Sequence, residues 1–338
     1  MNKRYNFAII GLGRAGSIHF QNIFVSNICA LKYALDIDEN KLNWFKNEYN
    51  NSNIKYLLSD NYSKVLEDPD LDAVVITTPT DCHEKEILLA LENGKHVFCE
   101  KPISISLDSI KSCYELAEKK NLVLHCSLNR RFDPSIKQLH KAMADKALGR
   151  IHIIKTCSRD SPKPSVDYLK ISNGIFHDCG VHDLDMICWL LSPCKPVSVY
   201  ATAFTQDTNI ANLHDSETVA MSLTFDNGTL AMIDLSRQST YGYDQRVEIH
   251  GEKGMIESLN QRPNNVQLST GNGTQLPPLM YSFPSRYRES YCNSLNEFVR
   301  CINAGKPSSI SAQEVLLLST LADACEQSCK TKQVVALE

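Results

Sequence analysis

Residues 7–16 read FAIIGLGRAG, an apolar run that ends directly in a glycine-rich loop. The run Phe7–Ile10 predicts a short strand, and the loop has the G-x-G-x-x-G spacing that opens the helix of a dinucleotide-binding βαβ unit. In such a unit Gly11 permits a tight turn, Gly13 lets the backbone approach a pyrophosphate, and Gly16 lets the helix pack close to the strand. This stretch therefore predicts a Rossmann fold at the start of the chain.

The helix after this loop should begin near Ala15, and we expect Arg14 and Ala15 to join the three glycines at the cofactor. Its free N–H groups and positive dipole end would face the pyrophosphate. Asp36 lies 20 residues beyond Gly16, at the end of the next predicted strand, where it would bind the adenosine ribose. Together with Asp38 it would repel a 2′-phosphate, so NAD is expected rather than NADP. A βα turn without any ligand is the alternative reading.

Strands and helices alternate through the first part of the chain. The apolar run at 73–76 predicts a strand that is buried on both faces, and 96–99 predicts another strand. Helical segments at about 84–93 and 107–120 follow them. Alternation of this kind with short links predicts a doubly wound parallel sheet, and thus an α/β NAD-binding Rossmann domain over residues 1–127.

After residue 129 the pattern changes to strands with few helices between them. The predicted strands lie at 151–157, 197–204, 217–225, 229–235 and 245–250, and two closing helices at 289–304 and 312–330. A turn at Asp226–Gly228 would join two of these strands as a hairpin. We therefore predict an α+β domain over 128–338, with an open, mostly antiparallel sheet, a covering helix at 180–191 and an irregular excursion at 259–286.

The composition argues against several classes of protein. A formal net charge of −4 gives no electrostatic footprint for nucleic acid. No run of about 18 apolar residues predicts a membrane span, and the apolar stretch at the N-terminus is too short for a signal peptide. Thirteen cysteines without a C-x-x-C pair suit a reducing compartment better than a disulfide scaffold. We expect a soluble, cytoplasmic protein that binds neither nucleic acid nor a membrane.

One lysine stands where ligands usually bind. The segment Cys99–Pro102 follows a predicted strand, and ligands of open α/β sheets bind at the carboxyl ends of the strands. Lys101 could therefore donate a hydrogen bond to a substrate hydroxyl and stabilise developing alkoxide charge. The alternative is a solvated surface lysine.

The densest group of chemically active residues is HDCGVHDLDM, residues 177–186. On a helix, Asp178 and His182 lie one turn apart on one face, which suits general acid–base catalysis. A capped helix start with a packed histidine is the alternative. A metal site competes because His177 and Asp183 stand nearby, but the two histidines are splayed around the helix and no cysteine pair offers a zinc site. We expect no metal.

Three further polar clusters lie at the domain junction, after one strand end and at the head of another strand. Each could line a pocket for a polyhydroxylated ligand, and each could equally be a contact between domains or subunits. The side chains that we select from them as candidate substrate contacts are Arg131, Asp160, Tyr241 and Tyr243.

These features together resemble the glucose–fructose oxidoreductase/inositol dehydrogenase family (Gfo/Idh/MocA), over essentially the whole chain. The motifs that carry the resemblance are GLGRAG at 11–16, TTPTDCH at 77–83, EKP at 100–102, NRRFD at 129–133 and DCGVHDLD at 178–185. Within the family, the stretch STYGYDQRVEIHGEKG at 239–254 is most similar to inositol 2-dehydrogenases.

The resemblance implies a catalytic lysine at Lys101 and a catalytic pair at Asp178 and His182, with the histidine as base. It implies that the residues after Thr77 run beside the nicotinamide half of NAD. The residues that complete the predicted NAD site are Thr78, Pro79, His83, Glu100 and Lys101. The resemblance also implies a cis peptide before Pro102 and a homotetramer joined through the faces of the second sheet.

The predicted reaction is the NAD-dependent oxidation of a secondary alcohol on a cyclic polyol, as in polyol catabolism. The leading substrate is myo-inositol, which would give 2-keto-myo-inositol (scyllo-inosose). One departure is Ser158, where some characterised inositol dehydrogenases have a histidine. The alternatives are another dehydrogenase of the same family, acting on scyllo-inositol, an aldose or a deoxy sugar, and a non-catalytic regulatory protein that senses NAD.

Overall fold

The computed structural model describes residues 3–337 and divides them into two compact units. The first unit consists of the residues up to 129 together with 289–317. The second unit consists of 130–288 and the residues from 318 onward. Each unit is built around its own sheet.

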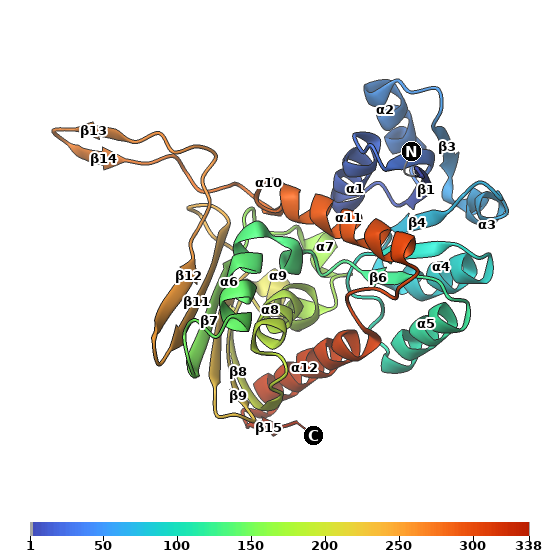
Figure 1. Cartoon of the computed structure of the whole chain (residues 1–338). Coiled ribbons are helices and arrows are strands. Elements are labelled where there is room, and N and C mark those ends of the chain that lie inside the picture. The colour runs from blue at the N-terminus through green and yellow to red at the C-terminus, as the bar shows by residue number, and fades with distance from the viewer. Residues whose placement is uncertain (1–2, 338) are drawn as a thin grey trace. The chain divides into compact units, whose positions relative to one another are not determined.

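The first unit contains a six-stranded sheet in the order β3-β2-β1-β4-β5-β6 (Figure 1). Its strands are β1 (Tyr5–Ile10), β2 (Cys29–Asp36), β3 (Lys55–Leu58), β4 (Ala73–Ile76), β5 (His96–Cys99) and β6 (Leu124–Cys126). Its helices are α1 (Arg14–Phe24), α2 (Glu39–Tyr49), α3 (Tyr62–Leu66), α4 (Thr80–Glu92), α5 (Leu107–Lys119) and α11 (Arg288–Ala304). All strand pairs are parallel, which confirms the predicted Rossmann sheet.

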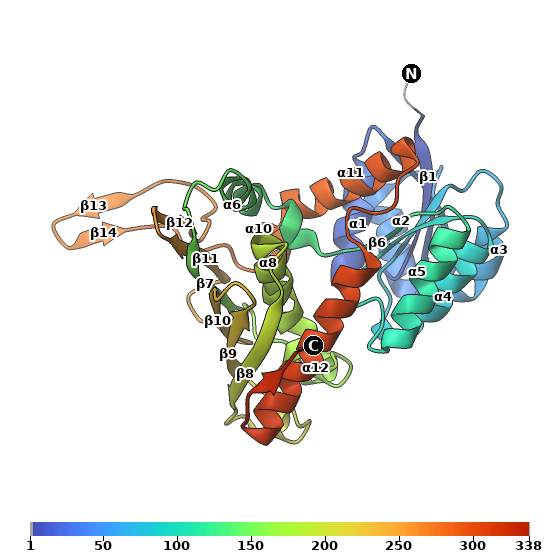
Figure 2. The same cartoon turned by 60° about the horizontal axis from the view of Figure 1, so that its bottom comes forward.

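The strand order places the carboxyl ends of β1, β4 and β5 next to one another. Strand β4 is fully buried along its whole length, as its unbroken run of Ala, Val and Ile predicts. Helices α4 and α5 lie side by side on this half of the sheet (Figure 2). The three loops that follow β1, β4 and β5 therefore meet at the crevice where the strand order reverses.

Helix α11 packs into the core of the first unit. The ring of Phe298 lies edge-on to Phe7 and Phe98, with centroids 6.1 and 5.7 Å apart. The division at 127/128 that we predict from the sequence assigns this helix to the second domain, whereas the structure groups it with the first. The difference has a physical reason, because nothing in the local sequence shows that the apolar face of α11 meets a strand from the other end of the chain.

The second unit contains a seven-stranded sheet in the order β12-β11-β7-β10-β9-β8-β15. Its strands are β7 (Ile151–Arg159), β8 (Pro196–Phe204), β9 (Thr218–Phe225), β10 (Leu230–Ser236), β11 (Asp244–Gly251), β12 (Gly254–Ser258) and β15 (Val335–Ala336). The pair β7–β10 is parallel and the other described pairs are antiparallel, so the predicted open, mostly antiparallel sheet is confirmed. The predicted hairpin turn joins β9 to β10, and its Gly228 has a φ of +83°.

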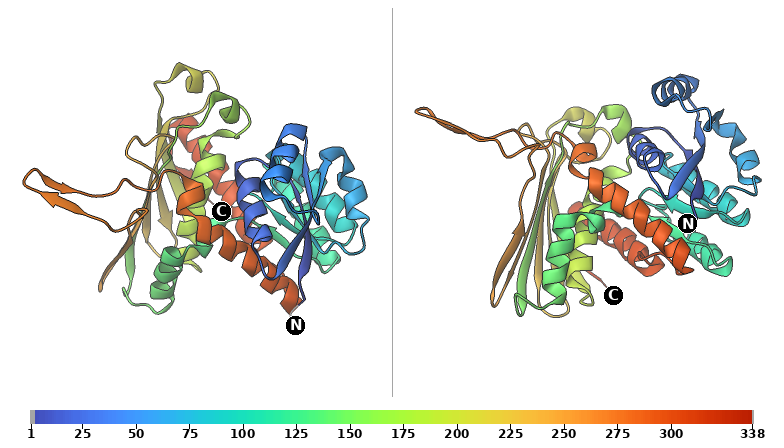
Figure 3. Two further views of the ribbon diagram at one scale, coloured as in Figure 1. Left: turned by 90° about the horizontal axis from the view of Figure 1, so that it is seen from above. Right: turned by 45° about the horizontal axis from the view of Figure 1, so that its top comes forward.

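Helices cover one face of this sheet. The remaining helices are α6 (Pro134–Ala144), α7 (Val166–Leu169), α8 (Val181–Leu191), α9 (Thr208–Ala211), α10 (Phe283–Arg286) and α12 (Ala312–Thr331). Figure 3 shows α6 and α8, in green, on the same face of the sheet. Leu184 and Ile187 of α8 are fully buried, whereas Met232 of β10 and Tyr200 of β8 are exposed. The sheet thus has one packed face and one open face.

The excursion expected at 259–286 is a projecting arm. It carries a short hairpin of β13 (Leu268–Thr270) and β14 (Gly273–Gln275), followed by α10. The hairpin extends away from β11 and β12 (Figure 2).

Within residues 3–337, no helix combines the length and the apolar character that a bilayer span requires.

Candidate active site

The three glycines of the first loop have different surroundings. Gly11 has a φ of +89°, and a Cβ built there would lie 2.7 Å from the carbonyl oxygen of Thr77. A Cβ on Gly16 would lie 2.0 Å from the carbonyl oxygen of Gly11, whereas a Cβ on Gly13 would meet nothing within 4 Å. Gly11 and Gly16 are therefore required by packing, and Gly13 borders open space. Gly13 is also the N-cap residue of α1 and has no side chain to cap that helix, so the loop fits a dinucleotide pyrophosphate.

Asp36 ends β2 and is 4% exposed. Its Oδ2 accepts a hydrogen bond of 2.6 Å from the backbone N–H of Leu12, and its Oδ1 accepts one of 2.9 Å from that of Asp38. The Nζ of Lys41 lies 3.8 Å from Oδ1. The carboxylate therefore fixes the glycine loop to the end of β2, and its remaining lone pairs can accept bonds from ribose hydroxyls.

Gly16→Ala and Gly13→Ala form a matched pair of variants. We expect Gly16→Ala to lower the free energy of unfolding by about 2–3 kcal/mol, because its Cβ would overlap a backbone carbonyl that cannot move aside. Gly13→Ala should leave stability within about 1 kcal/mol of the parent, yet weaken NAD binding at least about tenfold, or about 1.4 kcal/mol. Denaturant unfolding and calorimetric titration with NAD measure both effects. Unchanged NAD affinity in Gly13→Ala would contradict the assignment of the space beside Gly13 to the pyrophosphate of NAD.

The loop after β4 is tied to the glycine loop. The hydroxyl of Thr77 donates hydrogen bonds to the carbonyl oxygens of Ile10, at 3.0 Å, and Gly11, at 2.5 Å. The hydroxyl of Thr78 donates to Glu86 Oε2 at 2.6 Å. Burial raises the pKa of Glu86 to about 7. Thr78 and Pro79, both predicted beside NAD, are thus presented at the N-terminus of α4 by a loop fixed on two sides.

His83 joins this loop to the one after β5. The ring is 1% exposed, and its Nε2 lies 2.9 Å from the carbonyl oxygen of Thr78. Its Nδ1 lies 2.8 Å from the carbonyl oxygen of Pro102. Burial lowers the pKa of His83, although both carbonyls favour the protonated ring. Because both nitrogens contact the backbone, the geometry favours an indirect role for His83, in which it sets the spacing of the two loops beside the predicted cofactor.

Lys101 follows the carboxyl end of β5 and is half-buried. The Lys101–Pro102 peptide is cis, as the family resemblance implies. Beside it, Glu100 is 9% exposed and its Oε1 lies 2.7 Å from Nε2 of the fully buried His19. Burial alone would raise the pKa of Glu100, but the hydrogen bond with His19 and the charge of Lys101 leave that pKa below its usual range. The sequence analysis missed His19, although a histidine three residues after Gly16 was a visible signal.

In the second unit, Asp178 lies in a π-helical turn at Phe176–Gly180 that leads directly into α8. Asp178 is 8% exposed, and the half-buried His182 lies in the first turn of α8. The sequence predicts a regular helix here, and the π turn is a departure from it. Such turns occur frequently at functional sites.

Asp178 is held by donors on both carboxylate oxygens. The hydroxyl of Tyr168 donates to Oδ1 at 2.8 Å, and Arg237 donates to Oδ2 at 3.1 Å. The Sγ of Cys179 lies 3.7 Å from both Asp178 Oδ2 and Asp160 Oδ2. Burial and the charge of Asp178 raise the pKa of Asp160. The structure thus brings Asp160, a predicted substrate contact, into the same cluster as Asp178.

The residues of the competing metal hypothesis point to different partners. His177 Nε2 lies 3.1 Å from Asp323 Oδ1 on α12. Asp183 is fully buried and accepts a hydrogen bond of 2.7 Å from Ser158. Across residues 3–337, no group of three or more His, Cys, Asp or Glu side chains is arranged to hold a metal ion.

The other predicted substrate contacts have different surroundings. Arg131 is 4% exposed, and its Nε and Nη2 donate to Asp185, the shortest bond being 2.5 Å. Tyr243 is 5% exposed and lies edge-on to Tyr287. Both side chains have partners within the second unit, Asp185 for Arg131 and Tyr287 for Tyr243, whereas Asp160 lies beside Asp178.

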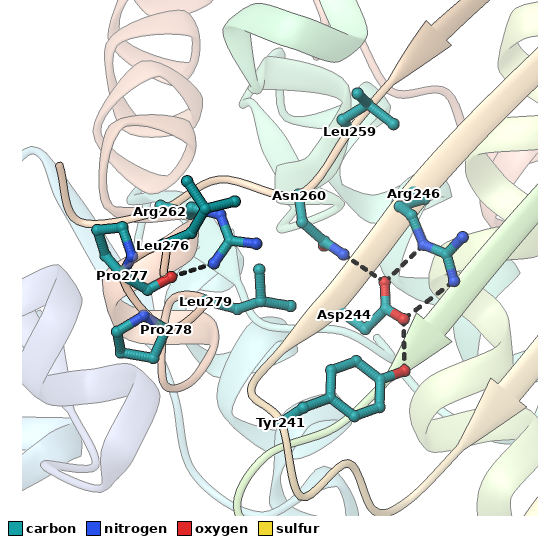
Figure 4. A pocket seen from close by; sticks show the side chains of 10 residues that line it. All are labelled: Tyr241, Asp244, Arg246, Leu259, Asn260, Arg262, Leu276, Pro277, Pro278 and Leu279. Carbon is teal, nitrogen blue, oxygen red and sulfur yellow. Dashed lines mark hydrogen bonds and ion pairs between the residues drawn. The ribbon is translucent and has the colours of Figure 1, made fainter. Parts of the chain in front are cut away.

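Tyr241 lines an open pocket at the base of the projecting arm (Figure 4). Its hydroxyl donates to Asp244 Oδ2 at 2.6 Å and accepts a bond of 2.9 Å from Arg159. Asp244 also accepts bonds from Asn260 and Arg246, and these satisfy its carboxylate. Tyr241, Asp244 and Arg246 lie on one side of the pocket, and Arg262 lies with the segment Leu276–Leu279 on the other.

Comparison with known proteins identifies both units. Residues 5–128 match the family model described as "Oxidoreductase family, NAD-binding Rossmann fold", and residues 140–337 match "Oxidoreductase family, C-terminal alpha/beta domain". The chain is 33% identical to a myo-inositol 2-dehydrogenase of Thermotoga maritima over 98% of each chain. It is 40% identical to an inositol 2-dehydrogenase of Rhizobium meliloti over 79% of this chain and 81% of that one.

A solved structure extends the comparison to a liganded relative. The scyllo-inositol dehydrogenase of Lactobacillus casei, crystallised with NAD(H) and scyllo-inositol, matches 99% of each chain with a TM-score of 0.90 and 26% identity.

Proposed function

Because this chain belongs to the Gfo/Idh/MocA oxidoreductase family, we propose that it oxidises myo-inositol to 2-keto-myo-inositol (scyllo-inosose) with NAD. The family resemblance of its motifs is confirmed, and the chain is an oxidoreductase with an NAD-binding Rossmann domain. The observation that best supports the proposal is the Asp178 carboxylate, which lies four residues before His182 and is fixed by donors on both oxygens. A carboxylate held in this way can accept a hydrogen bond from a substrate hydroxyl or orient the ring of His182.

We assign the cofactor to the crevice of the parallel sheet. Gly11, Gly13, Arg14, Ala15 and Gly16 would hold the pyrophosphate at the start of α1. Asp36 would accept hydrogen bonds from the hydroxyls of the adenosine ribose. The loops after β4 and β5 would flank the nicotinamide. When bound, NAD supplies the acceptor for the hydride that leaves the carbinol carbon.

The side chains of the protein transfer one proton and stabilise one developing negative charge. A ring nitrogen of His182 takes the hydroxyl proton as general base. The ammonium of Lys101 stabilises the oxygen as negative charge develops on it. Asp178 holds the reacting hydroxyl and stabilises the imidazolium that His182 becomes. Proton removal at this oxygen is what allows the hydride to leave and the ketone to form.

The ring position and the epimer belong to the same proposal. Asp160, close to Asp178, would accept a hydrogen bond from a second ring hydroxyl, which a polyol offers and a simple alcohol does not. The second candidate is scyllo-inositol, because a relative of the same fold binds that epimer and because Ser158 here bonds to Asp183 rather than presenting an imidazole.

Mixing the protein with NAD and a panel of polyols tests the function directly. We expect steady NADH formation with myo-inositol and a much slower rate with NADP, since Asp36 and Asp38 repel a 2′-phosphate. A faster rate with scyllo-inositol would select the second candidate. NAD binding without turnover of any polyol or sugar would overturn the proposal and favour a regulatory role.

We further propose a cytoplasmic homotetramer joined through the open face of the second sheet. Exposed Met232, Tyr200 and Phe204 on this face support an interface, because large apolar side chains rarely gather on a monomer's surface. Thirteen free cysteines support a reducing compartment. A tetramer mass by light scattering, lost on placing a charge at Met232, is the expected result.

A further inference from the structure

We propose that Arg237 is a positioning residue that keeps the Asp178 carboxylate ionised and fixed as a hydrogen-bond acceptor. This inference rests on the proposed function, because it takes Asp178 to act in alcohol oxidation. Arg237 follows β10, outside every motif that carries the family resemblance.

The guanidinium of Arg237 lies between two carboxylates. It is 1% exposed, and its Nη1 donates to Asp178 Oδ2 at 3.1 Å while its Nη2 donates to Asp215 Oδ2 at 2.7 Å. Burial would lower the pKa of Arg237, but the negative charges beside it raise that pKa instead. Arg237 is therefore a permanent buried cation, and its two ion pairs hold it against Asp178 and Asp215.

The second oxygen of Asp178 is held independently. The hydroxyl of Tyr168 donates to Oδ1 at 2.8 Å. Burial and the charge of Asp178 raise the pKa of Tyr168, so this hydroxyl remains a neutral donor. The thiol of Cys179 is a further, weak donor to Oδ2 at 3.7 Å. An ionised carboxylate has about four lone-pair sites, so it can accept from several donors at once, a substrate hydroxyl or His182 among them.

The charges around Asp178 explain why a cation is needed. The carboxylates of Asp160, Asp178 and Asp215 lie near one another in the second unit. Arg237 pairs with Asp178 and Asp215, and the charge of Arg130 favours the ionised form of Asp160. Without Arg237, two buried carboxylates would lose their counter-charge, and taking up a proton would be the least costly response. A protonated Asp178 would donate where the mechanism needs an acceptor, and it could not stabilise the imidazolium of His182.

Tyr168→Phe, Arg237→Lys and Arg237→Met test the inference through the pH profile of kcat/KM. The mechanism needs an ionised Asp178 as well as a neutral His182. Removing a donor or the cation makes Asp178 easier to protonate, so activity should be lost at a higher pH as the solution is acidified. We expect the acid limb to move up by about 1 pH unit in Tyr168→Phe and by about 1–3 units in Arg237→Met. Arg237→Lys keeps the charge and should show the smaller shift.

Two variants serve as matched controls. Tyr33→Phe removes a hydroxyl that donates to Asp68 at 2.6 Å, and Arg286→Met removes a buried guanidinium that donates to Asp133 at 2.6 Å. Both should leave the acid limb in place. A purely structural role for Arg237 would lower the folded fraction and scale the profile equally at every pH. Profiles of Tyr168→Phe and Arg237→Lys that differ from the parent only in height would overturn the inference.

A measurement without turnover separates this inference from the proposed function. In protein labelled with ¹³C at aspartate carboxyls, the signal lost in Asp178→Asn reports the ionisation of Asp178. We expect it to titrate at a higher pH in Arg237→Lys and in Tyr168→Phe than in the parent, with Tyr33→Phe unchanged. If no polyol is oxidised but this shift is found, the proposed function fails and the role of Arg237 stands. If polyols are oxidised but the titration is unmoved, the role of Arg237 fails alone.

Discussion

Lys101→Met should lower kcat for the oxidation of myo-inositol about 100- to 1,000-fold, while the variant still binds NAD. Removing one preorganised group that stabilises oxyanion charge typically costs this much. Methionine retains the aliphatic stem of the half-buried side chain, so the packing of the loop is preserved. The neighbouring Glu100–His19 contact fixes the loop independently of the ammonium group.

The control for this variant is Lys85→Met, which removes an exposed lysine on α4 in the same unit. Its steady-state rate should match the parent, and calorimetry should show that all three proteins bind NAD. If Lys101→Met kept kcat within about threefold of the parent, Lys101 would not stabilise the reacting oxygen.

His182→Asn should lower kcat about 100- to 10,000-fold, the range expected for loss of a general base. Asparagine keeps a polar side chain of similar reach but cannot take up the hydroxyl proton. The deficit should shrink in alkaline solution, where hydroxide in the solvent can remove that proton. Steady-state rates from neutral to alkaline pH measure both the loss and its partial recovery.

His152→Asn is the matched control, since His152 lies exposed on β7 of the same unit. It should retain the parent's rate and pH profile. A His182→Asn protein that turns over myo-inositol at the parent's rate, or loses activity by the same factor at every pH, would argue against His182 as the base.

The architecture of the first unit could be predicted from the sequence because its signals are local. Gly11 and Gly16 are demanded by contacts within one βα turn, and the buried run of β4 defines a central parallel strand. The two sheets and the hairpin at Gly228 follow from the same short-range periodicity. The packing of α11 could not be predicted, because it depends on Phe298 meeting strands from the other end of the chain.

The candidate site could be predicted only in part, for a related reason. Family motifs pointed to Asp178 and His182, but the π turn beneath them leaves no periodicity in the sequence that we could have recognised. Arg237 lies 59 residues from Asp178 in the sequence and Tyr168 lies 10 residues from it, and neither belongs to a motif. Conversely, Arg131 was selected for its polarity, yet its guanidinium is occupied by Asp185 in the interior. Polar clusters in a sequence do not reveal which members pair with one another.

A crystal structure of the protein with NADH and myo-inositol bound tests most directly the roles proposed for Lys101 and His182. We predict that Lys101 Nζ and a ring nitrogen of His182 each lie within about 3.2 Å of the same inositol oxygen. Contact of the two side chains with different oxygens, or a His182 ring turned away from the inositol, would contradict the shared reaction centre.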